Sequence, residues 1–86
     1  MLAQRLLYWA ETEPDKTALQ SRDKEGSYSK VSFKELYRSC LELESNLVSL
    51  GLRAGDHIAL YGDNTINWAI SYISIHFLGA VIIPLD

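Results

Sequence analysis

Apolar residues recur at helical spacing in three stretches of the chain. Residues 2–12 have a loose apolar side and predict a short helix, which ends before Pro14 because the residue preceding a proline avoids the helical region. Residues 32–50 predict a longer amphipathic helix. Residues 65–78 predict a third helix, whose apolar groups spread around most of its surface. The third helix therefore needs cover on more than one side.

The second helix has a start signal, an apolar stripe and a stop signal. Ser32 and Glu35 fit a capping box, in which each side chain accepts a hydrogen bond from the backbone N–H of the other residue. The stripe then follows at steps of four and three residues: Leu36, Cys40, Leu43, Leu47 and Leu50. We expect the stripe to face the core and Gly51 to end the helix in a left-handed turn.

Two pairs of short strands complete the pattern. Residues 17–22 and 28–31 flank a polar, glycine-containing segment and predict an antiparallel hairpin. Residues 57–61 and 80–84 are mostly apolar, as in strands that are covered on both faces. Because helix 65–78 connects these last two strands, they should be parallel, with a right-handed crossover.

The expected fold class is α/β, with a helix, a short β-hairpin, a helix and then a parallel strand–helix–strand unit. A parallel sheet needs helices on both faces, and this set of elements cannot supply them. The chain has 86 residues, whereas single domains most often have roughly 100–150. We therefore expect residues 1–86 to be the N-terminal fragment of a larger domain, with no second domain.

Residues 64–85 contain no Asp, Glu, Lys or Arg, and their length alone would permit a transmembrane helix. Polar residues, Gly79 and Pro84 interrupt the stretch, and residues 81–83 form a β-branched run that suits a strand. No Lys or Arg flanks it to orient a membrane span. We therefore expect no transmembrane segment here, but a buried helix followed by a buried strand.

Charge and cysteine content exclude several classes of function. The formal net charge is −3 and no run of like charges exceeds two residues, which argues against a nucleic-acid partner. A single Cys excludes an internal disulfide and a Cys-based zinc site, and it suits a reducing compartment. The first residues lack the basic-then-apolar order of a signal peptide. These features together predict a cytoplasmic protein.

Candidate chemistry is sparse. Residues 62–65 lie between a strand and a helix, where free backbone N–H groups could bind an anion. The simpler interpretation is a helix cap made by Asn64 or Thr65, and Asp63 would repel a phosphate. The five glycines match neither of the common phosphate-binding motifs.

Other reactive side chains also have structural explanations. His57 and His76 are far apart in sequence and have no acidic or Cys partner at ligand spacing, so a metal site is not predicted. We expect His76 to be a hydrogen-bonded core residue, His57 to lie near solvent and Cys40 to be a small buried hydrophobe. Trp9 and Trp68 lack interleaved basic residues and indicate packing. No catalytic, cofactor-binding or metal-binding residue can be assigned.

Four pieces of the chain, in order, resemble the start of the adenylate-forming acyl-CoA synthetases, the AMP-dependent synthetase/ligase family. Residues 14–19 read PDKTAL, residues 31–36 read VSFKEL and residues 50–60 read LGLRAGDHIAL. The fourth piece comprises DNTINW at 63–68 and GAVIIPLD at 79–86. The Asn64 to Trp68 spacing is similar to that in the long-chain fatty-acid branch. Departures from the family pattern, such as His57 in place of Arg or Lys, bear on the subfamily.

The resemblance implies that the parent protein joins a fatty acid to coenzyme A. A carboxylate attacks the α-phosphate of ATP, with Mg²⁺, and the thiol of coenzyme A then displaces AMP. The family's phosphate loop and catalytic lid follow the region matched here, so none of its functional residues transfers to this chain. The segment would be an inactive scaffold within the large adenylation domain, with the remainder of that domain as its partner. The parent would be cytoplasmic or peripheral at a membrane surface.

Two other classes of function stay open from the residues alone. The chain could be a small stand-alone nucleotide- or anion-binding module that uses the turn after Gly62. It could also be a protein-interaction module that completes its sheet with a partner. Because its two parallel strands lack cover, we expect the isolated chain to be poorly folded or to associate with itself.

Overall fold

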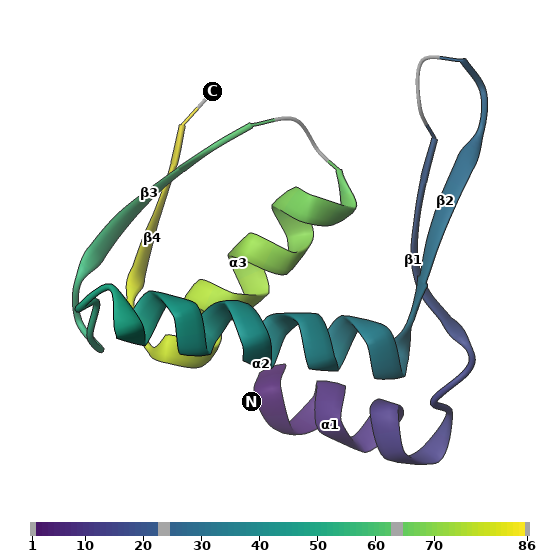
Figure 1. The fold of residues 1–86 in the computed structure, drawn as a ribbon, viewed down its shortest axis with the longest axis horizontal. Coiled ribbons are helices and arrows are strands. Elements are labelled where there is room, and N and C mark those ends of the chain that lie inside the picture. Colours follow the sequence, from purple (N-terminus) through teal and green to yellow (C-terminus); the bar gives the residue numbers. More distant parts are fainter. Residues whose placement is uncertain (1, 23–24, 63–64, 86) are drawn as a thin grey trace.

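The computed structural model describes residues 2–22, 25–62 and 65–85 and confirms the expected α/β class and order of elements (Figure 1). The elements in chain order are α1 (Leu2–Thr12), β1 (Thr17–Arg22), β2 (Tyr28–Ser32), α2 (Phe33–Ser49), β3 (His57–Tyr61), α3 (Ile66–Leu78) and β4 (Val81–Leu85). The boundaries differ from the sequence-based ones by at most one residue, which is usual for element ends. The strand expected at 80–84, for example, begins and ends one residue later.

The strands form two separate two-stranded sheets within the described residues. β1 and β2 are antiparallel, with Ser21 opposite Ser29, so the predicted hairpin is confirmed. β3 and β4 are parallel and in continuous register from His57 opposite Val81 to Tyr61 opposite Leu85. Helix α3 connects them, which confirms the predicted strand–helix–strand unit.

Both helix caps expected from the sequence are present. The Glu35 amide donates to Ser32 Oγ (3.1 Å), and the Ser32 amide donates to Glu35 Oε1 (3.2 Å), which completes the capping box of α2. At the start of α3, the Trp68 amide donates to Thr65 Oγ1 (3.2 Å). Gly51 follows α2 at a φ of 95°, the left-handed conformation predicted for it.

The core lies where α1, α2 and α3 meet the end of the hairpin. Its fully or nearly buried apolar members come from four elements: Leu6, Val31, Leu36, Cys40 and Ile75. Aromatic side chains extend it, with Trp9 of α1 stacked on Phe33 of α2 at a ring-centroid distance of 5.7 Å. Tyr37 and Phe77 make a similar contact between α2 and α3 at 6.1 Å.

The apolar stripe of α2 enters this core only in part. Leu36 and Cys40 are buried, whereas Leu43 and Leu47 are half-buried. Leu50 is 79% exposed, so the expectation that the whole stripe faces the core is wrong at this end. Leu50 is the C-cap residue of α2, beyond its last helical turn, and the buried contacts concentrate in the first half of the helix.

The starts of β3 and β4 are fastened together by backbone contacts. The Gly55 amide donates to the Gly79 carbonyl (3.0 Å), and the Val81 amide donates to the Asp56 carbonyl (2.7 Å). Gly79 has a φ of 83° and ends α3 in a left-handed cap, a conformation that glycine adopts without strain. A Cβ at this position would lie 3.4 Å from the Cβ of Ala54, so the two turns are in close contact.

Candidate functional site

The turn between β3 and α3 acts as a helix cap in the described part of the chain. Thr65 Oγ1 accepts a hydrogen bond from the Trp68 amide. The hydroxyl therefore pairs with a free N–H group of the first turn of α3 and is not directed at a ligand. This confirms the cap interpretation for Thr65. Asp63 and Asn64, which also entered the anion-binding hypothesis, lie outside the described residues.

The two histidines do not form a site. His57 is exposed on β3, as expected. His76 is exposed as well, so the expectation of a hydrogen-bonded core histidine is wrong. It lies in the last turn of α3, and its neighbours Ser74 and Ile75, rather than His76 itself, occupy the face that packs inward. Among the described residues, no three His, Cys, Asp or Glu side chains are grouped as a metal site would require.

Cys40 is a packing residue, as predicted. Its side chain is 0% exposed, and its Sγ lies 3.9 Å from the Ile70 carbonyl oxygen across the contact of α2 with α3. Burial raises the pKa of the Cys40 thiol, and a hydrogen bond with Ser74 offsets only part of this increase. A thiol with a raised pKa holds less of the reactive thiolate, which argues against a nucleophile.

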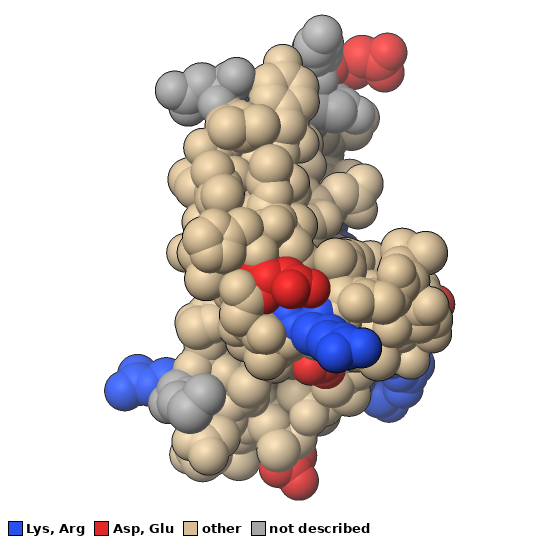
Figure 2. Space-filling view, turned by 90° about the vertical axis from the view of Figure 1, so that its left-hand side faces the viewer, with Lys and Arg blue, Asp and Glu red and all other residues tan. Residues whose placement is uncertain are grey.

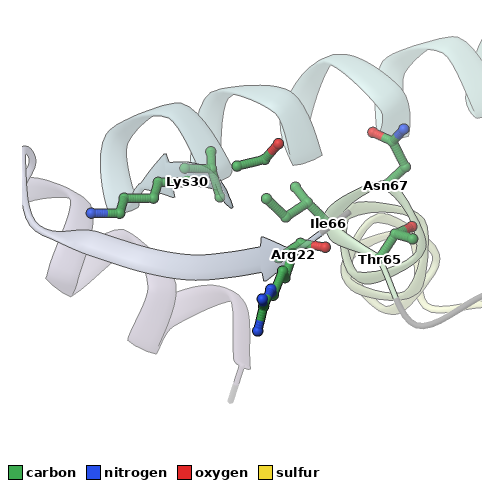
Figure 3. A pocket seen from close by; sticks show the side chains of 8 residues that line it. Arg22, Lys30, Thr65, Ile66 and Asn67 are labelled. Atoms are coloured by element: carbon green, nitrogen blue, oxygen red, sulfur yellow. The ribbon is translucent and has the colours of Figure 1, made fainter. Parts of the chain in front are cut away.

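The first cleft of note lies between the hairpin and the start of α3 (Figure 3). Its volume is about 480 Å³, and its lining includes two cations, Arg22 and Lys30, together with Thr65 and Asn67. Figure 3 shows that Lys30 extends away from Arg22 and Asn67, and that the Arg22 guanidinium also leads away from the helix start. Arg22 instead lies over the Tyr28 ring, at 5.6 Å from its centroid.

Because the two cations of this cleft diverge, they cannot clamp one phosphate or carboxylate between them. A charge-assisted anion site needs donors that converge on one point. The cleft therefore gives no support to a stand-alone anion-binding module. Of its residues, Thr65 alone was named individually from the sequence, as a helix cap, and no local motif marks the cleft, because the hairpin and α3 meet only through the tertiary fold.

The other notable surface is one face of the β3–β4 sheet. Burial alternates along β3: Ile58 and Leu60 are partly buried, and the other three residues of the strand are exposed. Apart from His57, the exposed residues of this face are apolar: Ala59, Tyr61, Val81, Ile83 and Leu85. A parallel sheet is normally covered on both faces, so this face is that of an incomplete layer.

The charge distribution agrees with such a contact surface. Figure 2 views the molecule from the side that carries β3 and the end of α2, and charged side chains occupy only small parts of a largely uncharged surface. Tyr61 is 73% exposed and Leu85 is 49% exposed. Exposed apolar area of this kind marks a surface that another segment or chain covers. Sequence reasoning predicted missing cover but could not tell which residues face outward, because β3 and β4 are apolar at successive positions.

Comparisons with known proteins agree with this picture along nearly the whole chain. The family model described as AMP-binding enzyme matches residues 6–86. The chain is 30% identical over 73 residues to "3-[(3aS,4S,7aS)-7a-methyl-1,5-dioxo-octahydro-1H-inden-4-yl]propanoyl:CoA ligase" of Mycobacterium tuberculosis, a match that covers 85% of this chain and 13% of that protein. It is 32% identical over 65 residues to "Long chain acyl-CoA synthetase 5" of Arabidopsis thaliana, covering 76% of this chain and 10% of that protein.

A solved structure shows the same fold. The acetoacetyl-CoA synthetase from Streptomyces lividans superimposes with a TM-score of 0.90 and 29% sequence identity, over 96% of this chain and 13% of that one. The chain thus spans between 10% and 13% of the length of these three proteins. With a family match over residues 6–86 and the fold of a solved synthetase, this chain belongs to the AMP-binding enzyme family, within the acyl-CoA ligase superfamily.

Proposed function

We propose that the protein containing this chain is an AMP-forming acyl-CoA ligase and that residues 1–86 form the N-terminal part of its adenylation domain. The observation that carries the proposal is the family match over residues 6–86, joined to relatives whose names are acyl-CoA ligases or synthetases. In the proposed reaction a carboxylate oxygen bonds to the α-phosphorus of ATP and pyrophosphate leaves. The sulfur of coenzyme A then bonds to the acyl carbon, and AMP and the thiol proton are released.

The role of this chain in that reaction is structural. Catalysis of phosphoryl and acyl transfer depends on donors and cations that converge on the reacting oxygens. The described residues offer no such convergence, since the two cations of the hairpin cleft diverge and the Thr65 hydroxyl caps α3. The uncovered face of β3 and β4 supports docking against the remainder of the adenylation domain.

ATP, Mg²⁺ and coenzyme A therefore belong to the rest of the parent protein. The described residues contain no cluster of three candidate metal ligands, and hard cations such as Mg²⁺ require several oxygen ligands, often including substrate phosphates. No step of the reaction is assigned to a side chain of this segment.

For the acyl substrate we propose a long-chain fatty acid. The Asn64 to Trp68 spacing and the 32% identity to a long-chain acyl-CoA synthetase support this choice. The other two relatives carry names with different acyl groups, a bicyclic propanoyl group and acetoacetyl. Acetoacetate and a bicyclic carboxylate are therefore the competing substrates in a test, and acetate is added as a short-chain control.

The test uses the longer protein that carries these residues and measures pyrophosphate release from ATP with each carboxylate, with and without coenzyme A. We expect turnover with a long-chain fatty acid and a much lower kcat/KM with acetate or acetoacetate. The 86-residue chain alone serves as the control and should show no turnover. Failure to form any acyl-adenylate would reject the ligase proposal, whereas a preference for another carboxylate would reject only the long-chain assignment.

A further inference from the structure

The surface between α1 and α2 forms a groove that plays no part in the proposed function. The two helices lie side by side and run in opposite directions (Figure 1). The Lys34 amide donates to the Pro14 carbonyl (3.1 Å), which brings the start of α2 to the segment that follows α1. The groove has a volume of about 430 Å³, within the range of ligand pockets.

The groove changes character along its length. Lys34 of α2 lines it at the end nearest Pro14, and Arg38 follows one helical turn further along α2, midway between Lys34 and Leu41. Leu7 of α1 and Leu41 of α2 line the other end and are 38% and 41% exposed. Leu41 follows Lys34 by seven positions along α2, which corresponds to about 10 Å along the helix axis. The half-buried ring of Tyr37 lies between these ends and is held from behind by its contact with Phe77.

We infer that this groove binds a medium-chain fatty acid, with its carboxylate at Lys34 and its alkyl chain along Tyr37, Leu7 and Leu41. A ligand with one anionic end and one apolar end matches the two ends of the groove in charge and polarity. Glu11 also lines the groove, from the α1 wall, and would repel the carboxylate, so the carboxylate lies against α2. Arg38 already interacts with Glu35, which leaves Lys34 as the principal partner.

This inference is independent of the proposed ligase activity. Equilibrium dialysis of the 86-residue chain against labelled decanoate, below its micelle concentration, measures binding without requiring turnover. Circular dichroism and sedimentation velocity at the same protein concentration select conditions in which the chain is folded and not associated. We expect saturable binding of decanoate, weaker binding of decanol, which lacks the charge, and no binding of acetate, which lacks the chain. Binding that does not saturate, or equal binding of decanol and decanoate, would overturn the charge-matched site.

Two pairs of variants locate the ligand. Lys34→Glu should weaken decanoate binding by about tenfold, while Arg53→Glu makes the same change of charge on an exposed cation outside the groove. Leu41→Asp should also weaken binding by about tenfold, while Val81→Asp places the same charge on a similarly exposed residue of the sheet. Acidic residues are favourable in the first turn of a helix, so Lys34→Glu keeps α2 intact, which circular dichroism verifies.

The matched controls decide the outcome. Equal losses in Lys34→Glu and Arg53→Glu would mean that only net charge matters and would overturn the inference. A larger loss in Val81→Asp than in Leu41→Asp would move the ligand to the open sheet face. A further outcome compares the 86-residue chain with the longer protein. If the chain binds decanoate but the longer protein does not, a segment of the longer protein covers the groove, and the fatty-acid site would be rejected.

Discussion

The hairpin side of the molecule and the β3–β4 side both carry many apolar residues, but they bury them differently. On the first side, three elements contribute Leu6, Val31, Leu36 and Cys40 to one cluster, each at most 9% exposed. On the second side, one face of the sheet packs inward, while Tyr61, Val81 and Leu85 are 73%, 46% and 49% exposed. The difference separates a core that the chain completes by itself from a layer that needs additional elements.

The largest expected effect comes from truncating the completed core. Leu36→Ala should lower the free energy of unfolding by about 2–5 kcal/mol, because the side chain is 3% exposed and its loss leaves a cavity. Leu50→Ala is the matched control at the other end of the same stripe, and we expect a change within about 0.5 kcal/mol. Urea unfolding of both variants measures the difference. Equal effects would mean that the two ends of α2 are equally buried in solution.

The next effect concerns the incomplete layer. We expect the isolated chain to associate with itself through the sheet face, since each fully exposed large apolar side chain that could be buried forgoes roughly 1.5–3 kcal/mol. Replacing Tyr61 and Ile83 together by Ser should shift the chain toward a monomer in sedimentation velocity. Val48→Ser, at a 54% exposed position on α2, should leave the association unchanged. A wild-type monomer with a sharp thermal transition would contradict the idea of an incomplete layer.

The smallest effect lies at the start of α2, far from the open face. Hydrogen bonds from the Ser32 backbone and side chain, followed by the charge of Arg38, hold the pKa of Glu35 below its ordinary value of 4.5. A lowered folded-state pKa means that the stabilisation is present above pH 4.5 and is lost as the pH falls through the folded value. Glu35→Gln should therefore remove a small pH dependence of stability on the acidic side. Unfolding midpoints are measured as a function of pH for the wild type and for Glu35→Gln. Identical profiles would exclude this role of Glu35.

Local signals predicted the elements well because each depends on neighbours in sequence. The capping box at Ser32 and the left-handed stop at Gly51 both occur as expected. Errors arose where exposure depends on distant segments. His76 lies on an apolar helix yet faces solvent, and Leu50 continues an apolar spacing beyond the part of α2 that other elements cover.

The candidate sites were harder to predict than the fold. The outward face of β3 and β4 has no alternating pattern in the sequence, and the groove between α1 and α2 combines residues from helices that a hairpin separates. Only the spacing of Lys34 and Arg38 hinted at a basic edge on α2, and that spacing is also common on solvated helix faces. Tertiary contacts, rather than composition, bring these residues together.

The close contact between the turns at Gly55 and Gly79 has a consequence for motion. Hydrogen bonds between the turns before β3 and β4 fix the amino end of the parallel pair. Tyr61 and Leu85 are the last residues of the two strands, at the opposite end. Local opening of a fold begins where buried contacts are fewest. The strand pair should therefore open from its carboxyl end while its amino end stays paired. Amide hydrogens near Val81 should exchange with solvent more slowly than those near Leu85.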